Sequence, residues 1–481
     1  MTAPDSPTAS AATAVPTISS LPPFSSASSQ EHTLAVAPVR LDERISALDT
    51  IRGFGLLGIL LMNICAFGLP LSAYANPVPA GGATGLNLFT WCFMNVAADG
   101  KMRAIFSVAF GASVYLLIDR LSRKGAAADA ADIHYRRMLW LMLFGSMHAY
   151  LIWIGDILFP YSLMGLVLYP LRKLSPRALL ITAGIMVLGM AGNGAYSYVH
   201  LENLQRADFQ IQTDEKAGKK LTSDQEDQKK EWEDAVKEFS PSPEDLKKET
   251  DAHLGGYFKL VAYRAKDVYR FHSAPIYALS RFDILAMMLI GLALMKLGVL
   301  TGSYSTKFYI WMALLSFAIG VPLDTWAAWF AVKRHFSIGP WYLTGVEYEF
   351  GRFTAFGYIA VILLVIKSGA LRSATRTLAY AGRMAFSNYI LTSLICTTIF
   401  EGYGFGLFGK LQRYQLYGIV FAVWAVILII SPIWLRHFRF GPLEWAWRSL
   451  TYWKKQPFRI QPSGLTPSAE PQPLQPLADH N

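Results

Sequence analysis

The 481-residue sequence is short of charge: only 16% of its residues are Asp, Glu, Lys or Arg, whereas ordinary soluble domains contain about a quarter. This shortage excludes a set of soluble domains. Uncharged residues gather in apolar runs of about 18 to 24 residues, the length that crosses a bilayer core of about 30 Å. The sequence therefore predicts an all-α, polytopic integral membrane helical bundle.

Cysteine is also scarce. The three cysteines, Cys65, Cys92 and Cys396, lie in or beside apolar segments and form no CxxC pair. They therefore indicate neither a disulfide framework nor a zinc site, and we expect no metal. The chain contains no GxGxxG or P-loop motif that would cradle phosphates. No basic residue precedes Arg40, which argues against a cleaved signal peptide and favours a disordered tail over residues 1–43.

Basic residues set the predicted topology. Lys and Arg near a span stay on the cytoplasmic side, so Arg40, Arg44 and Arg52 place the N-terminus inside. The same alternation in the later short loops predicts about ten spans with both termini cytoplasmic. The predicted spans are Ile51–Leu71, Ala104–Ile118, Met138–Gly155, Ile157–Leu171, Ala178–Val199, Pro275–Leu297, Phe308–Ala331, Phe350–Ile366, Leu378–Phe400 and Tyr414–Leu435.

One long polar segment divides the spans into two halves of about five each, and two shorter segments follow the last span. In the polar segment, Thr222 with Gln225 and Ser242 with Asp245 have the pattern of helix starts. Leu443, Trp447 and Leu450 share one face of a helix suited to the membrane interface. The predicted regions are a first membrane half at 44–200, a polar, helical extracytoplasmic loop at 201–274, a second membrane half at 275–440, an interfacial helix at 441–456 and a disordered tail at 457–481.

Ionisable side chains inside spans cost about 2.5 to 3.5 kcal/mol on insertion, so each is a candidate for function. His148 and Asn63 lie at depth, and several charges lie toward the outer ends. The candidates for catalysis are Asn63, Asp99, Lys101, Arg103, His148, Asp156 and Asp283. The candidates for binding a cofactor near the inner ends are Arg44, Asp49, Arg52, Arg136, Arg137, Arg383 and Asn388.

The inner candidates have two interpretations. Asp49 and Arg52 are three residues apart, which favours an ion pair on one helical face. The arginines match the geometry of phosphate groups and suit an anionic donor. Anchoring of the topology explains them equally well.

His148 is the candidate proton carrier, because a histidine can be neutral near pH 7 and still take up a proton. Asp156 follows eight residues later, which is about 12 Å along a continuous helix. Direct contact between the two side chains is therefore not expected. A simple interhelical hydrogen bond is the alternative role for His148.

A short apolar segment, Leu86–Ala98, ends at the charged residues Asp99, Lys101 and Arg103. Irregular backbone at membrane depth survives only where protein or water satisfies it. Together with Arg281 and Asp283, this segment predicts a polar cavity that opens outward. We expect the buried charges and His148 to converge on one hydrated pocket.

Several blocks of the sequence carry a family resemblance. The blocks 44–53, 61–70, 99–111, 145–158, 382–389 and 441–452 resemble those of the YeiB-type bacterial inner-membrane proteins, which have a C-terminal domain of unknown function. The resemblance extends from about Arg44 to Trp453 and implies a multi-pass protein of the bacterial plasma membrane. The first helix is also distantly similar to that of the transmembrane acyltransferase superfamily.

The second resemblance implies transfer of an acyl group from cytosolic acyl-CoA, such as acetyl-CoA, to a glycan or lipid acceptor on the other side of the membrane. The catalytic histidine of that superfamily follows the first core helix, but this chain has no histidine between Asn63 and His134. The leading hypothesis therefore uses His148 as the general base. Arg103 and Lys101 would stabilise the oxyanion, and Asn63 would orient the acyl carbonyl.

Two other functions fit the same residues. A transporter of a small solute would use the buried charges as gates and counter-ions. A structural or assembly factor would use the polar loop to engage a partner. We expect contact with membrane lipid and with a glycan or lipid acceptor, and none with nucleic acid; the sequence leaves a homodimer open.

Overall fold

The computed structural model describes residues 46–123, 129–273 and 281–460. The tail predicted at 1–43, the candidate Arg44 and most of the tail predicted at 457–481 lie outside these residues. Within them the chain is helical, and the one β feature is an isolated antiparallel bridge between Phe438 and Arg459. The all-α prediction is confirmed.

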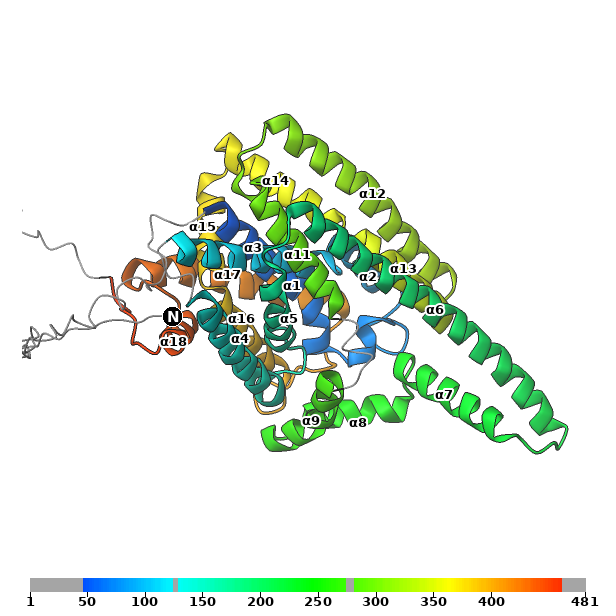
Figure 1. Cartoon of the computed structure of the whole chain (residues 1–481). Coiled ribbons are helices and arrows are strands. Elements are labelled where there is room, and N and C mark those ends of the chain that lie inside the picture. Colours follow the sequence, from blue (N-terminus) through cyan, green and yellow to red (C-terminus); the bar gives the residue numbers. More distant parts are fainter. Residues whose placement is uncertain (1–45, 124–128, 274–280, 461–481) are drawn as a thin grey trace, which may run out of the picture.

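The helices follow the chain in this order (Figure 1). The first group is α1 (Ser46–Gly68), η1 (Leu71–Tyr74), α2 (Gly85–Ala97), α3 (Lys101–Arg123), α4 (Ala130–Met147), η2 (His148–Ile152), α5 (Leu158–Leu171) and α6 (Pro176–Lys216). The polar helices are α7 (Ser223–Phe239), α8 (Pro243–His253) and α9 (Tyr257–Ser273). The last group is α11 (Phe282–Lys296), η3 (Val299–Thr301), α12 (Thr306–Lys333), α13 (Ile338–Gly351), α14 (Thr354–Ser368), α15 (Arg372–Arg383), α16 (Ala385–Phe400), α17 (Arg413–His437) and α18 (Pro442–Thr451).

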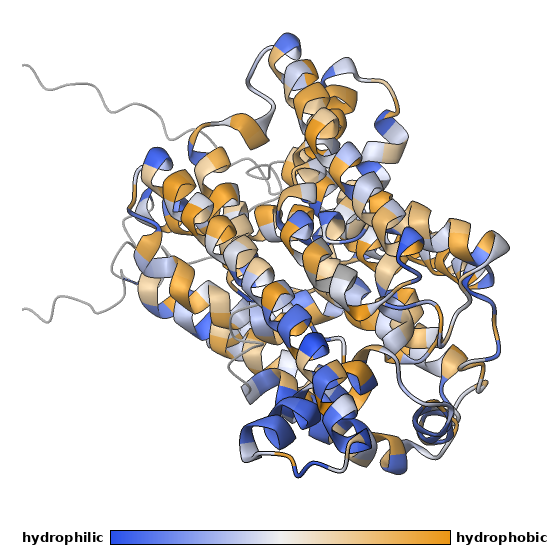
Figure 2. Cartoon of the chain, turned by 90° about the vertical axis from the view of Figure 1, so that its right-hand side faces the viewer, coloured by the Kyte–Doolittle hydropathy of each residue, from blue (hydrophilic) through white to orange (hydrophobic). Residues whose placement is uncertain are grey.

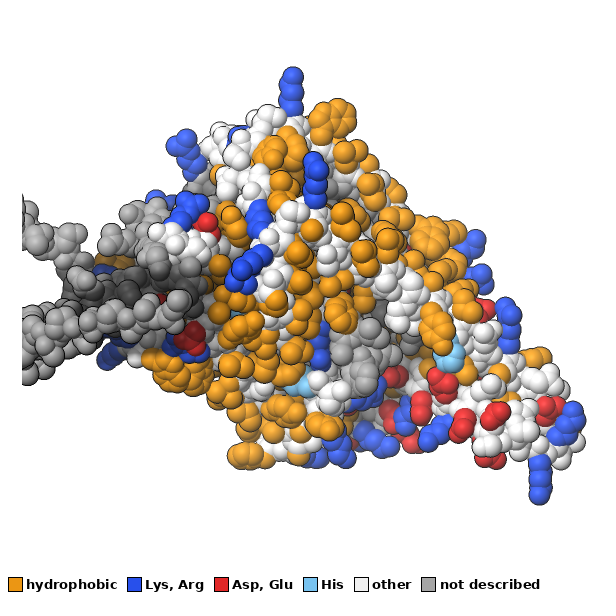
Figure 3. Space-filling model, viewed as in Figure 1, with side chains coloured by type: hydrophobic (Ala, Val, Ile, Leu, Met, Phe, Trp, Pro, Cys, Tyr) orange, Lys and Arg blue, Asp and Glu red, His pale blue; other side chains and the backbone are white. Residues whose placement is uncertain are grey.

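Among the described residues, six segments are long and apolar enough to cross a membrane: Ser46–Gly68, Gly85–Arg123, Pro176–Lys216, Thr306–Lys333, Gly345–Ser368 and Arg413–His437. Two shorter apolar helices are α5 and α16. The protein is thus a membrane-type helical bundle with about six candidate spans. Apolar side chains cover much of the face of the bundle seen in Figure 3, and hydrophilic residues concentrate where α7, α8 and α9 lie in Figure 2.

Helix α1 is the centre of the bundle. Within its most apolar stretch 72% of the residues are buried inside the molecule, whereas only 17% are buried in the corresponding stretch of α6. The outer helices α6, α12 and α17 expose large apolar side chains such as Ile185, Trp311 and Phe421. Such faces suit contact with lipid, since a helix that is apolar toward the surface needs an apolar surrounding. Figure 3 shows apolar side chains over much of the face on which α6 and α12 lie.

Two helix crossings at the centre depend on glycine. A Cβ at Gly291 of α11 would lie 2.1 Å from the Val108 carbonyl oxygen of α3, and one at Gly111 of α3 would lie 2.0 Å from the Met288 oxygen. A Cβ at Gly382 of α15 would lie 1.9 Å from the Asp49 oxygen of α1. These backbones approach closely only because the side chains are absent, as is common between membrane helices.

We therefore expect Gly291→Ala to destabilise the protein by about 1 to 3 kcal/mol through overpacking. Gly184→Ala on α6 is the matched control, because a Cβ there meets nothing within 4 Å. That change should be stabilising by about 0.5 to 1 kcal/mol through helix propensity. Thermal unfolding of both purified variants in detergent measures the difference. Equal melting temperatures would contradict the close-contact argument.

The polar helices confirm the predicted helix starts. Thr222 and Gln225 form a reciprocal capping box at α7, and the Ser242 side chain accepts the Asp245 N–H at the start of α8. Helix α6 runs across the boundary predicted at residue 200, because it continues without a break to Lys216 and ends only before Gly218, where φ is +71°. Its end packs against α7, at the opposite end of the molecule from α18 (Figure 1). We call α7, α8, α9 and this end of α6 the polar domain.

Candidate functional site

The chain leaves the α-helix at His148. Residues His148–Ile152 form a single π-helical turn, and Trp153 follows in an extended conformation. The chain therefore folds back on itself, and Asp156 Oδ1 lies 2.9 Å from His148 Nδ1. The sequence argument that kept these two side chains about 12 Å apart is wrong, because it assumed a continuous helix. π turns of this kind occur often at functional sites.

Ser393 of α16 completes a buried chain of three side chains. Its Oγ lies 2.9 Å from His148 Nε2. The second Asp156 oxygen accepts the Phe159 N–H at 2.7 Å. His148 and Ser393 are each 1% exposed, and the Asp156 side chain is 0% exposed. We call Ser393, His148 and Asp156 the serine–histidine–aspartate chain.

A very small void lies beside Ser393. Asn63, Trp153 and Thr392 are among its lining residues, and its volume of about 10 Å³ is the room that one water needs. The Trp153 indole Nε1–H is buried and has no hydrogen-bond acceptor among the described residues. Ser393 and Trp153, a residue with an unused hydrogen-bond donor, therefore line the same void.

The polar domain covers the loop that holds Asp156. Arg264 of α9 donates to the Leu151 carbonyl at 2.8 Å and to the Ile152 carbonyl at 2.5 Å. These carbonyls belong to the π turn, which leaves them without the partners of a continuing α-helix. Burial lowers the pKa of the Arg264 guanidinium. His272 stacks on Phe159 with ring centroids 3.9 Å apart, so α9 fixes both sides of the loop.

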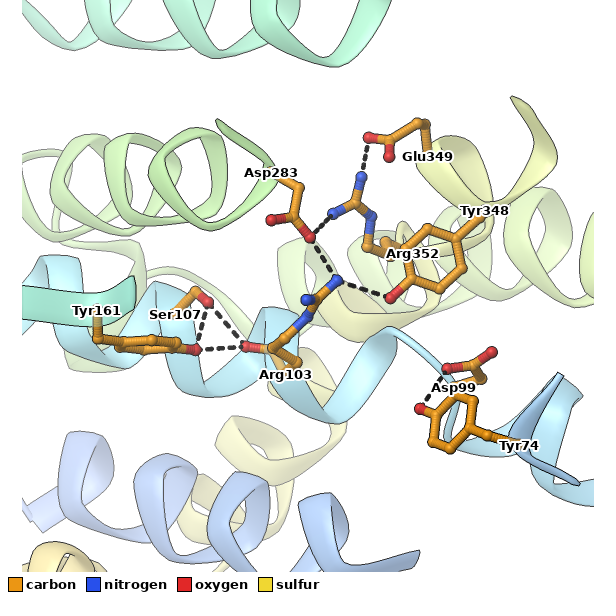
Figure 4. A network of polar contacts seen from close by, with 9 residues as sticks. All are labelled: Tyr74, Asp99, Arg103, Ser107, Tyr161, Asp283, Tyr348, Glu349 and Arg352. Carbon is orange, nitrogen blue, oxygen red and sulfur yellow. Dashed lines mark hydrogen bonds and ion pairs between the residues drawn. The ribbon is translucent and has the colours of Figure 1, made fainter. Parts of the chain in front are cut away.

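A separate charge network lies between α3, α11 and α13 (Figure 4). Arg103 donates to Asp283 at 2.5 Å and to the Tyr348 hydroxyl at 2.8 Å. Arg352 donates to the same Asp283 oxygen at 2.9 Å and also pairs with Glu349. Asp283 thus bridges two guanidinium groups.

The other candidates near the end of α2 pair separately. Lys101 binds Asp324 of α12 at 2.6 Å and the Asn95 carbonyl at 2.9 Å. Asp99 accepts the Tyr74 hydroxyl at 3.2 Å. The short helix predicted at Leu86–Ala98 is confirmed as α2, but the charges that follow it contact several partners instead of one shared ligand space.

The large cavity lies at the α18 end of the molecule, not beside the charges at the end of α2. Its volume is about 230 Å³, roughly twenty times that of the void beside Ser393. The charged residues that line it are Asp49, Arg52, Arg120, Arg137, Arg383, Glu444 and Arg448. Five arginines against two carboxylates make it cationic, and we call it the arginine cavity.

Only some of the predicted cofactor-binding residues line the arginine cavity. Arg52 pairs with Asp49 at 2.7 Å, as the spacing predicts, and also donates to Ser113 at 2.7 Å. Arg137 lies over the Trp447 ring, 4.1 Å from its centroid, and faces the cavity. Arg136 instead pairs with Asp132.

Asn388 is directed away from the arginine cavity. Its amide donates to the Ser431 hydroxyl at 2.9 Å and to the Ala381 carbonyl at 3.1 Å. Arg383, by contrast, lines the cavity, and its Nε–H has no hydrogen-bond acceptor among the described residues. Of the seven predicted residues, Asp49, Arg52, Arg137 and Arg383 therefore come together.

Glu444 of α18 explains a break in the ninth predicted span. The run Leu378–Phe400 is divided at Met384 into α15 and α16. Glu444 Oε1 accepts the N–H groups of Phe386 and Ser387 at 2.7 and 3.1 Å, and Oε2 accepts the Ser387 hydroxyl at 2.5 Å. A carboxylate stabilises the positive end of a helix dipole. Burial nevertheless raises the pKa of the Glu444 carboxyl.

Two tyrosines lie between the arginine cavity and the polar clusters. Tyr389, Leu56 and Ile59 line both the cavity and the void beside Ser393. Tyr161 also lines the cavity, and its hydroxyl donates to the Arg103 carbonyl at 3.2 Å. His148, Arg103 and Asp283 do not line the cavity. The expected convergence of the buried charges and His148 on one hydrated pocket is therefore wrong: Arg103 and Asp283 pair with each other, and His148 belongs to the other cluster.

Sequence reasoning missed Ser393, Tyr389 and Glu444 as site residues. A serine in an apolar helix gives no signal, because its hydroxyl usually bonds its own backbone. The sequence predicts an interfacial helix around Glu444 and no role for its side chain. A single carboxylate among the apolar residues Leu443, Trp445 and Trp447 is nevertheless a signal that this side chain is buried.

Comparisons with known proteins agree with the sequence resemblance. Residues 294–454 match the family described as a protein of unknown function, DUF418. The chain is 32% identical over 416 residues to the uncharacterized protein YeiB of Escherichia coli (strain K12), with 85% of this chain and 96% of that protein covered. It is 29% identical over 443 residues to the uncharacterized protein YxaH of Bacillus subtilis (strain 168), with 88% and 98% covered. No solved structure matches the chain significantly. The chain belongs to the YeiB family.

Proposed function

We propose that this protein is a membrane acyltransferase that takes an acyl group from an acyl-CoA-type donor and passes it to a glycan or lipid acceptor on the other side of the membrane. The arginine cavity is the observation that carries the proposal. The planar guanidinium group of arginine can form two parallel hydrogen bonds to phosphate oxygens. A CoA-type donor presents several phosphates next to a long, less polar arm. The cavity offers both kinds of surface, because five arginines line it together with apolar and aromatic residues such as Phe106, Phe110 and Tyr161.

The proposed topology keeps about ten spans and places both termini in the cytoplasm of a bacterium, with the protein in the inner membrane. In this orientation the arginine cavity faces the compartment that holds acyl-CoA, and the polar domain lies on the acceptor side. Charged donors do not cross the bilayer, so a donor site at the cytoplasmic end is required by the chemistry.

His148 is the proposed general base. Its Nε2 is 2.9 Å from a hydroxyl oxygen, and Asp156 at Nδ1 orients the ring. A base held in this way takes the proton from an attacking hydroxyl and returns it to the leaving group. The fit of Asn63 beside the same void supports its proposed role at the acyl carbonyl. Arg103 and Lys101 have buried carboxylate partners, so we assign them to positioning α3 instead of to the oxyanion.

Arg137→Gln tests the donor site. Because a hydrogen bond to a charged group contributes about 1.5 to 3 kcal/mol, we expect affinity for CoA to fall by about ten- to one hundredfold. Calorimetric titration of the detergent-purified protein with CoA gives this number. Arg136→Gln is the matched control, since Arg136 lies next in the sequence but pairs with Asp132 and should leave affinity unchanged.

The same titration separates acyl transfer from transport of a small solute. A transporter would use the buried charges as counter-ions and would not bind CoA. Absence of CoA binding by the wild-type protein, or equal losses in the two arginine variants, would contradict the proposed donor site.

A further inference from the structure

The hydrogen positions in the serine–histidine–aspartate chain follow from its partners. One Asp156 oxygen accepts the Phe159 N–H and the other lies 2.9 Å from His148 Nδ1. An ionised carboxylate can only accept, so Nδ1 carries the ring proton and Nε2 is left as an acceptor. The Ser393 hydroxyl therefore donates to Nε2 at 2.9 Å. Its alternative acceptor, the Tyr389 carbonyl, is farther away at 3.3 Å.

We propose that Ser393 is a covalent acyl carrier: its hydroxyl accepts the acyl group from the donor as an ester before the acceptor receives it. This inference rests on the proposed function for its donor, an acyl thioester. A nucleophile in hydrogen-bond contact with a base, which is in turn oriented by a third group, is the arrangement that activates a weak nucleophile.

The step balances as follows. His148 Nε2 takes the Ser393 proton while Oγ forms a bond to the thioester carbonyl carbon, and the carbonyl oxygen becomes an oxyanion. The carbon–sulfur bond then breaks, the thiolate leaves, and His148 returns the proton to sulfur. An acceptor hydroxyl later attacks the serine ester with His148 again as base, which restores the Ser393 hydroxyl.

The void beside Ser393 supplies what the oxyanion needs. Trp153 and Asn63 both line it, and the Trp153 Nε1–H is buried with no acceptor in the described part of the chain. A buried donor without a partner is costly and usually has a functional reason. In the proposed reaction Trp153 is the candidate donor to the oxyanion, because donors that meet charge only in the transition state accelerate the reaction most.

Access to Ser393 passes Tyr389. The Tyr389 ring lies 5.0 Å from the His148 ring and lines both the arginine cavity and the void. Its hydroxyl donates to the Gly155 carbonyl and accepts the Ile157 N–H, each at 3.1 Å. The void holds about one water, so in the proposed reaction Tyr389 and the two other residues that line both spaces, Leu56 and Ile59, must move to admit an acyl group.

Two acyl reagents test the proposal on the full-length protein in detergent. Wild-type protein is incubated with acetyl-CoA or with the small activated ester p-nitrophenyl acetate, quenched in acid and digested for peptide mass mapping. We expect an acetyl group on Ser393 with both reagents. The adduct should be lost in Ser393→Ala and in His148→Gln, and Ser393→Cys should carry it as a thioester.

Thr398→Ala is the matched control, because Thr398 is on the same helix, its hydroxyl donates to the Leu394 carbonyl at 2.7 Å and it does not line the void. This variant should acetylate as wild type does. If acetyl-CoA is bound and consumed while Ser393 stays unmodified by either reagent, Ser393 is not an acyl carrier, and the acyl group passes directly from donor to acceptor. If acetyl-CoA does not bind but p-nitrophenyl acetate modifies Ser393, the proposed donor fails and the nucleophile stands.

Discussion

His148→Gln is expected to lower the rate of acyl transfer by about 10²- to 10⁴-fold, the usual contribution of a general base. Glutamine is close in size and can still form hydrogen bonds to Asp156 and Ser393, but it does not take up a proton near neutral pH. The fold should therefore persist while the proton transfer is lost. Acetyl-CoA consumption by protein in liposomes of bacterial lipid, measured by release of free thiol, gives the rate.

The conservative substitution separates catalysis from packing. His148 is 1% exposed, so a purely structural histidine would show its loss as a lower melting temperature. A variant that melts like wild type and loses turnover supports the base, and one that melts like wild type and keeps turnover contradicts it. Ser146→Ala on the same helix, where the hydroxyl donates only to the Met142 carbonyl, should keep both properties.

Asp283→Ala is expected to destabilise the protein by about 3 to 5 kcal/mol, the effect of removing one partner from a buried ion pair. Asp283 bridges Arg103 and Arg352, and the Arg352 side chain is only 2% exposed. Glu349 still faces Arg352, but one carboxylate would then remain for two guanidinium groups. Thermal unfolding in detergent, followed by tryptophan fluorescence, measures the change.

The control for this prediction is another ion pair with an exposed carboxylate. Asp132 pairs with Arg136 and its side chain is 66% exposed, so Asp132→Ala should cost about 0 to 1 kcal/mol. Similar melting temperatures for the two variants would show that the Asp283 network does not hold α11 against α3 and α13.

The fold class was predictable because it depends on composition and periodicity. The apolar, helical character of the chain, the short α2, and the starts of α7 and α8 are local properties of the sequence that appear in the structure, although about six candidate spans are found among the described residues where ten were predicted. The extent of α6 was missed for a physical reason: polarity marks where a chain leaves the membrane, but nothing in residues 200–216 stops a helix. The residue where a chain leaves the membrane and the residue where its helix ends need not be the same.

The site was less predictable, because it depends on departures from regular helix. A π turn after Met147 brings Asp156 to His148, and no residue between them is a glycine or proline until Gly155. Likewise, Arg136 and Arg137 are identical in type and adjacent in sequence, and only the direction of each side chain from α4 separates a surface ion pair from a cavity wall. Tertiary contacts decide both cases.

The capping of α16 by Glu444 has a consequence for biosynthesis. The helix that carries Ser393 and Tyr389 obtains its N-terminal carboxylate from α18, which emerges from the ribosome only after α17 has been made. A chain that ends before Pro442 contains the six candidate spans of the described residues but lacks this carboxylate and the α18 residues that line the arginine cavity. We therefore expect a protein truncated before Pro442 to insert into the membrane and to lose CoA binding.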